Sequence, residues 1–119
     1  MAQHNELGKL GEDLAIEHLV GLGYEIKERN FTFEKAEVDI IALKEKTLAV
    51  IEVKTRSSID FGLPQDFVKS KKIQLLTKAI NQYVIQNDLD LEVRFDIIAI
   101  HKVNDSYNIE HLVDAFFHF

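Results

Sequence analysis

The alternation of hydrophobic and polar positions predicts two helices and five strands. Apolar residues at helical spacing predict a helix from about Asn5 to Leu22, and Gly23 is a natural stop signal. A second helical pattern runs from about Gln65 to Gln86. Segments rich in β-forming residues predict strands at 24–33, 36–43, 47–56, 92–103 and 107–117. This order predicts an α/β fold with a mixed central sheet flanked by helices.

The first helix carries an apolar face and, next to it, a stripe of small residues. The predicted apolar face consists of Leu7, Leu10, Leu14, His18 or Leu19, and Leu22. The stripe is formed by Gly8, Gly11 and Ala15, beside Glu12, and indicates a helix that lies close against a flat surface. His18 is most simply a core histidine with satisfied hydrogen bonds.

Length and composition fit one domain spanning residues 1–119. The chain has 119 residues, of which 46% are hydrophobic, enough for one core. It has no cysteine, which excludes disulfides and thiolate metal sites. The N-terminal segment lacks the features of a signal peptide, and no apolar run approaches the ~20 residues of a membrane span. We therefore expect a cytoplasmic protein without a membrane partner.

The charge is distributed unevenly along the chain. The formal net charge is −6, which argues against extensive binding to phosphate backbones. Between residues 53 and 78, however, six basic side chains stand against two acidic ones. A basic middle segment in an acidic protein permits a local surface that faces phosphate groups.

Candidate chemistry is concentrated in the hairpin formed by 36–43 and 47–56. If the strands turn at Glu45 and Lys46, facing residues have numbers that add to 91, so Asp39 lies opposite Glu52. Strand alternation then places Asp39, Glu52 and Lys54 on one face of the sheet.

Two facing carboxylates destabilise a sheet unless a positive charge or a proton lies between them. Lys54, a proton or a divalent cation would each serve, and oxygen ligands suit Mg²⁺ or Mn²⁺. A metal ion held there would assist attack on a phosphodiester. The alternative is a solvated strand face with weak ion pairs. The chain has a second Glu-x-Lys, Glu25-Ile26-Lys27, for which we expect no chemistry.

The hairpin motif, Asp39 followed by Glu52-Val53-Lys54, resembles the PD-(D/E)xK nuclease superfamily. The chain is more specifically similar to the small bacterial YraN-type family, whose outline resembles that of Holliday-junction resolvases. The matching stretches, which cover nearly the whole chain, are GKLGEDLAIEHLVGLGYEIKERNF (8–31), EVDIIA (37–42), VIEVKTR (50–56), Phe61, Gly62 and Pro64, Val68 with Lys71 or Lys72, RFDIIAI (94–100) and HLVDAF (111–116). One departure is Ala36, where the family usually has glycine.

The resemblance implies a restriction endonuclease-like αβββαβ core and assigns roles to four residues. Asp39 and Glu52 would bind Mg²⁺ or Mn²⁺, Lys54 would be the catalytic lysine, and Glu12 would complete the metal site from the first helix. The alternative for Glu12 is an exposed glutamate on a helix face. The implied activity is hydrolysis of DNA phosphodiester bonds, with branched or structured DNA as a candidate substrate.

Other polar residues carry weaker signals. The candidates for contact with nucleic acid are Arg56, Gln65, Lys69, Lys71 and Lys72. A surface ion pair explains Arg56 equally well, and a solvated helix face is the more common meaning of such a set of lysines. Arg94 and Asp96 are expected to form a partly buried ion pair that anchors their strand. The apolar ending DAFFHF either packs on the core or forms a contact in a homodimer.

Two other function classes remain open from the sequence. One is a non-catalytic nucleic-acid-binding module that keeps the nuclease fold, which predicts salt-sensitive DNA binding without turnover. The other is a protein-interaction module, which predicts no DNA binding even at low salt.

Overall fold

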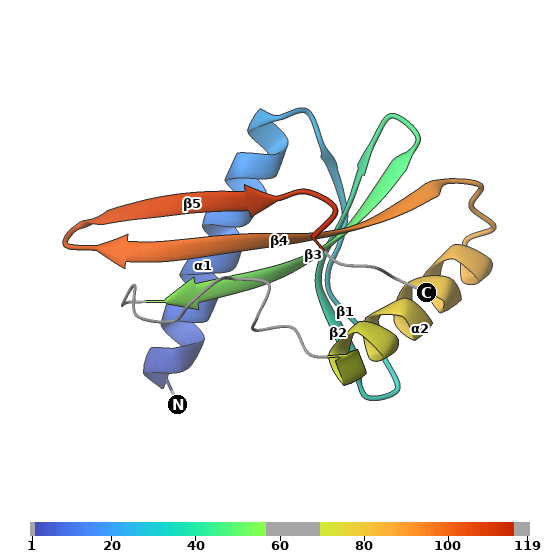
Figure 1. The fold of residues 1–119 in the computed structure, drawn as a ribbon, viewed down its shortest axis with the longest axis horizontal. Coiled ribbons are helices and arrows are strands. Elements are labelled where there is room, and N and C mark those ends of the chain that lie inside the picture. Colours follow the sequence, from blue (N-terminus) through green and yellow to red (C-terminus); the bar gives the residue numbers. More distant parts are fainter. Residues whose placement is uncertain (1, 57–69, 116–119) are drawn as a thin grey trace.

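The computed structural model describes residues 2–56 and 70–115 of the chain, and it shows two helices and one five-stranded sheet (Figure 1). The elements, in order, are α1 (Ala2–Gly21), β1 (Glu25–Phe33), β2 (Ala36–Lys44), β3 (Thr47–Arg56), α2 (Ser70–Gln86), β4 (Glu92–Val103) and β5 (Ser106–Leu112). The strands are ordered β1-β2-β3-β4-β5, with β3 and β4 parallel and the other neighbours antiparallel. This confirms the predicted α/β fold with a mixed sheet.

The observed bounds agree with the predicted strands except at the C-terminal end. The last strand stops at Leu112, whereas the sequence predicted continuation to 117. The chain turns away because Asp114 has a positive φ of 55° and donates its backbone N–H to Asp96. Residues 65–69 of the predicted second helix and residues 116–119 lie outside the described part of the chain.

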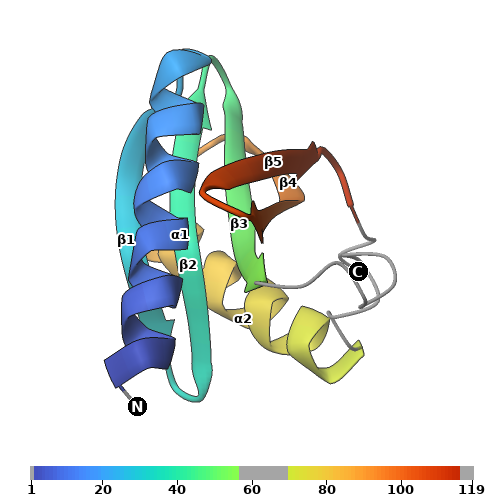
Figure 2. The ribbon, with the colours of Figure 1, turned by 90° about the vertical axis from the view of Figure 1, so that its left-hand side faces the viewer.

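The sheet has a hydrophobic core on each face, and each core is covered by one helix. Leu76, Ile80 and Tyr83 of α2 pack on one face against residues such as Phe95. Ala15 and Leu19 of α1 pack on the other face with a separate set of strand residues. Figure 2 shows α1 running along β1 and β2. Neither described helix is long and apolar enough to cross a membrane.

The contact between α1 and the sheet differs in part from the sequence prediction. The buried positions on α1 are Gly11, Ala15 and Leu19, whereas Leu10 and Leu22 of the predicted apolar face are exposed. A Cβ added at Gly11 would overlap the Thr55 hydroxyl of β3, so only glycine allows this approach. Two of the three small residues therefore face the sheet, since a Cβ at Gly8 would meet open space.

The regular alternation of side chains between the two faces of the sheet is interrupted in both β1 and β2. In β1, Arg29 contacts residues of α1, but Phe31, two positions later, packs on the α2 side. In β2, Val38 packs on the α2 side and Ile40 on the α1 side. Regular alternation would put both members of each pair on the same face. Asn30, with a φ of +57°, lies between the two residues in β1, and a register shift occurs earlier in the strand, between Ile26 and Glu28.

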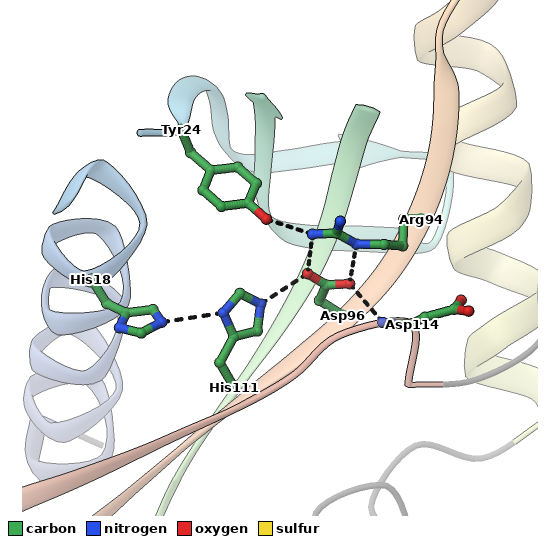
Figure 3. A network of polar contacts seen from close by, with 6 residues as sticks. All are labelled: His18, Tyr24, Arg94, Asp96, His111 and Asp114. Atoms are coloured by element: carbon green, nitrogen blue, oxygen red, sulfur yellow. Dashed lines mark hydrogen bonds and ion pairs between the residues drawn. The ribbon is translucent and has the colours of Figure 1, made fainter. Parts of the chain in front are cut away.

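A chain of polar contacts links α1, β4 and β5 (Figure 3). Arg94 donates two hydrogen bonds of 2.9 Å to the fully buried carboxylate of Asp96, which confirms the predicted ion pair on this strand. Arg94 also donates to the Tyr24 hydroxyl. Oδ2 of Asp96, one of the two oxygens that accept from Arg94, is also 2.8 Å from Nε2 of His111, whose Nδ1 is 3.1 Å from Nε2 of His18.

His18 is thus hydrogen-bonded, as predicted, but half-buried rather than part of the core. Because the ionised Asp96 can only accept, Nε2 of His111 carries the donating proton. In the neutral ring, Nδ1 of His111 is then left to accept from His18. Although burial acts to raise the pKa of Asp96, hydrogen bonds from His111 and Arg94 hold that pKa below its usual value.

Candidate active site

Glu52 is the central residue of the candidate site and one of the two buried charged residues among those described. It lies on β3, which pairs with β2 on one side and with β4 on the other, and only 4% of it is exposed. Two ammonium groups contact its Oε2 atom, Lys54 Nζ at 3.3 Å and Lys72 Nζ at 3.0 Å. Its other oxygen, Oε1, is buried and has no hydrogen-bond partner among the described residues.

The interpretation of this strand as a solvated face is therefore wrong at Glu52. The second Glu-x-Lys of the chain provides an internal comparison, since Lys27 and Glu25 form a 3.3 Å pair on the edge strand β1. Glu25 is 66% exposed, so that pair lies in water. The same three-residue pattern is buried in a central strand and solvated at an edge, and only the buried copy lies beside a second carboxylate.

Asp39 lies beside Glu52, as the predicted register requires. The observed pairs Lys44–Thr47, Leu43–Leu48, Ile41–Val50 and Ile40–Ile51 confirm the hairpin register. The recorded ladder ends one pair before Asp39 and Glu52. There, Oδ2 of Asp39 accepts the backbone N–H of Val53 at 2.8 Å.

The surroundings of Asp39 favour its protonated form. Burial raises the pKa of Asp39 to about 7, and the charges of Glu52 and Glu12 act in the same direction. The hydrogen bond from Val53 and the charge of Lys72 oppose this change only in part. Asp39 is therefore a half-buried carboxyl that lacks a sufficient positive partner.

Glu12, on α1, lies close enough to Asp39 for its charge to raise the pKa of that carboxyl. The close approach of Gly11 to Thr55 fixes the height of the helix above β3. Glu12 is 19% exposed, and its Oε1 atom lies 3.4 Å from Nε of Arg29, which also binds Asp13 at 2.6 Å. The view of Glu12 as an ordinary exposed glutamate is thus not supported. Sequence reasoning missed Arg29, which holds Glu12 across 17 positions of chain.

The candidate nucleic-acid contacts are spread over several elements. Arg56 ends β3 and donates to the carbonyl of its neighbour Thr55 at 3.2 Å. Lys71 is exposed on α2, while Lys72 turns toward Glu52. The contact of Lys72 with the site was not predicted, because nothing in the sequence shows which lysine of the pair faces the sheet. Gln65 and Lys69 lie outside the described residues.

The donor set fits a divalent cation that prefers oxygen. Within the described part of the chain, no three acidic, histidine or cysteine side chains already form a cluster that could hold a metal ion. Nevertheless, Glu52 presents a buried oxygen without a partner, and the adjacent Asp39 lacks a compensating charge. Both features are those of a site that gains from an added positive charge. Carboxylate oxygens suit Mg²⁺ or Mn²⁺, with Glu12 as a third candidate ligand.

Comparison with known proteins shows the family to which the chain belongs. The model of the uncharacterised protein family UPF0102 matches residues 11–100, which contain Glu12, Asp39, Glu52 and Lys54. The chain belongs to UPF0102. This confirms the resemblance to the YraN-type family, and the sheet with its two helices agrees with a restriction endonuclease-like core.

Several curated UPF0102 proteins match over essentially their whole length. The UPF0102 protein of Flavobacterium psychrophilum is 66% identical over 119 residues, which is all of both chains. That of Flavobacterium johnsoniae is 64% identical over 123 residues, again with full coverage of both. A UPF0102 protein of Bacteroides fragilis is 44% identical over 117 residues, or 98% of this chain and 97% of the relative.

Proposed function

We propose that this UPF0102 protein is an endonuclease that uses Mg²⁺ or Mn²⁺ to hydrolyse phosphodiester bonds in DNA. The observation that carries the proposal is the buried Oε1 atom of Glu52, which has no partner among the described residues and lies beside the charge-deficient Asp39. A structural ion pair would satisfy both oxygens, whereas a metal ligand needs one to be available.

The residues around this pair supply the other requirements of phosphodiester hydrolysis. A bound divalent ion would neutralise phosphate charge and lower the pKa of a water molecule. Lys54 lies on the same face as Glu52, 3.3 Å from it, so its ammonium group can stabilise the negative charge that develops on the phosphate. Arg29 holds Glu12 in place, and the hydrogen bond from Val53 orients the carboxylate of Asp39.

The charge distribution restricts where DNA would bind. With a net charge of −6, most of the surface repels a phosphate backbone. The local contacts would be made by basic side chains of β3 and α2, namely Arg56, Lys71 and Lys72. The other candidates, Gln65 and Lys69, lie outside the described residues. Such a limited contact area favours branched or otherwise structured DNA over long duplex, and a homodimer would present two sites to a two-stranded substrate.

Cleavage assays with matched variants test the proposal. Asp39→Asn, Glu52→Gln and Lys54→Ala should each lower the Mn²⁺-dependent cleavage of a four-way DNA junction by at least about 100-fold. Lys27→Ala changes the solvated copy of the motif and should leave cleavage unchanged. Melting temperatures show whether each variant is folded.

A variant that combines Asp39→Asn, Glu52→Gln and Lys54→Ala should not cleave. Equal cleavage by wild type and by this combined variant would show that the activity comes from a contaminant. Salt-sensitive junction binding without cleavage in Mg²⁺ or Mn²⁺ would favour the non-catalytic DNA-binding module. No junction binding at low salt would favour a protein-interaction role.

A further inference from the structure

Two ammonium groups converge on one oxygen atom of Glu52, and they come from different elements. Lys54 is two positions away on β3, whereas Lys72 reaches the same oxygen from α2. The distance from Lys72 is the shorter of the two, 3.0 Å against 3.3 Å. An ammonium group and a divalent ion have the same sign of charge, so Lys72 already neutralises the carboxylate that the proposed metal would bind.

Lys72 interacts with several acidic side chains of the site at once. Burial acts to lower its pKa, but the charges of Glu52, Asp39 and Glu37 raise the pKa above its ordinary value. The ammonium group is therefore fully charged and is attracted by three carboxylates. The hydrogen bonds of Lys72 account for only one oxygen, Oε2 of Glu52, which leaves Oε1 and Asp39 uncompensated.

Lys72 is also the more exposed of the two lysines. Its side chain is 41% exposed, compared with 23% for Lys54. A long side chain at that exposure can turn into solvent without opening a cavity in the core. Lys54, in contrast, is held by the pairing of β3 with β4.

We propose that Lys72 is the resident counter-ion of the metal-free site and that a divalent cation displaces it from Glu52. This rests on the proposed function, because it requires the cation to bind at Asp39 and Glu52. Displacement keeps a positive charge beside Glu52 in both states. After displacement, Lys72 remains beside the site on α2, but its ammonium group no longer occupies the position taken by the ion.

Calorimetric titration with Mn²⁺ at pH 8 tests the displacement. Lys72→Met should bind Mn²⁺ about five-fold more tightly than wild type, because the ion no longer competes with a partly exposed ion pair. Lys78→Met is the matched control, since Lys78 lies on the same helix but pairs with the exposed Glu34 at 3.1 Å. Its affinity should equal that of wild type.

Thermal unfolding provides a second measurement that does not depend on catalysis. In EDTA, Lys72→Met should melt below Lys78→Met, because Glu52 stays buried with one partner fewer. Saturating Mn²⁺ should close this difference. Lys72→Gln keeps a hydrogen-bond donor for Glu52 without the charge. Like Lys72→Met, it should bind Mn²⁺ more tightly than wild type and Lys78→Met do.

The outcomes separate this inference from the proposed function. Unchanged or weaker Mn²⁺ binding by Lys72→Met would overturn the displacement while leaving the metal site in place. A melting difference that persists in Mn²⁺ would make Lys72 a purely structural partner of Glu52. No Mn²⁺ binding by wild type or by Lys72→Met would overturn the displacement and the metal-dependent function together.

Discussion

Asp39 shows how one buried side chain makes stability depend on pH. Its pKa in the folded protein is about 7, against an ordinary value of 3.8, so the native state holds a proton that the unfolded chain releases. Stability from this group is therefore present below pH 4 and is lost as the pH rises through 7. The cost of ionisation arises because Asp39 is partly removed from water beside the charges of Glu52 and Glu12.

Asp39→Asn should therefore stabilise the metal-free protein at pH 8. The amide is isosteric, still accepts the Val53 N–H, and does not ionise, so we expect a gain of roughly 1–3 kcal/mol in the free energy of unfolding. The gain should shrink toward zero near pH 4. Urea unfolding in EDTA at pH 4, 6 and 8 measures it. A gain independent of pH would show that Asp39 is not the group that titrates.

The sequence allowed the carboxylate pair to be found but not its surroundings. Hairpin arithmetic placed Asp39 beside Glu52 because antiparallel register is local and is set by a two-residue turn. The contacts of Arg29 with Glu12 and of Lys72 with Glu52 were not predicted, because they depend on how β1 and α2 pack against the hairpin. The burial of Glu52 likewise follows from the pairing of β3 with β4, which are separated by α2 along the chain.

At the level of elements, the packing of α1 on β3 determines where Glu12 lies. Helical periodicity predicted the existence of this helix but assigned its buried face to leucines such as Leu10 and Leu22, which are exposed. The buried face was assigned wrongly because the most hydrophobic stripe of α1 is not the stripe that packs closest to the sheet. Small residues allow the backbone to approach the sheet, and the sequence signals for both stripes overlap on the helix surface.

Gly11→Ala should move α1 away from β3. The added Cβ would overlap the hydroxyl of Thr55 and lie 3.0 Å from its Cβ, so we expect a loss of about 1–3 kcal/mol of stability. Mn²⁺ affinity should also fall, since Glu12 moves with the helix. Thermal unfolding and calorimetry measure the two effects.

Gly8→Ala is the matched control for this substitution. Its Cβ meets nothing within 4 Å, so the change should be neutral or should stabilise the helix by up to about 1 kcal/mol. Combining Gly11→Ala with Thr55→Ala removes the overlapping hydroxyl and should restore part of the stability. A Gly11→Ala protein as stable as Gly8→Ala would show that the close approach is not required.

At the level of the whole molecule, the hydrogen-bond network around Asp96 connects α1 with β4 and β5. The candidate active site contains no residue of these two strands. The network joins His18 of α1 to Arg94 and Asp96 of β4 and to His111 of β5. The sequence identified the Arg94–Asp96 pair because the two residues alternate on one strand. It could not identify the histidine pair, since His18 and His111 are separated by 93 positions.

Asp96→Asn should destabilise the protein strongly. The carboxylate is fully buried and accepts hydrogen bonds from Arg94, His111 and the backbone of Asp114. The NH₂ group of an amide would replace one accepting oxygen with a donor, which would then face another donor. We expect a loss of roughly 3–5 kcal/mol, as for other broken buried ion pairs. Urea unfolding at pH 7 measures it, and a loss below about 1 kcal/mol would show that the network does not hold the strands together.

His18→Gln tests the outer end of the network by its pH dependence. Burial and the charge of His111 lower the pKa of His18 below 6.5, so the native state binds fewer protons than the unfolded chain and stability falls as the pH drops through that value. Glutamine can still donate to His111 but does not titrate. The stability of His18→Gln relative to wild type should therefore rise on acidification, whereas that of Asp39→Asn should fall. Unfolding curves of both variants between pH 4 and 8 measure these opposite slopes, and parallel slopes would contradict one assignment or the other.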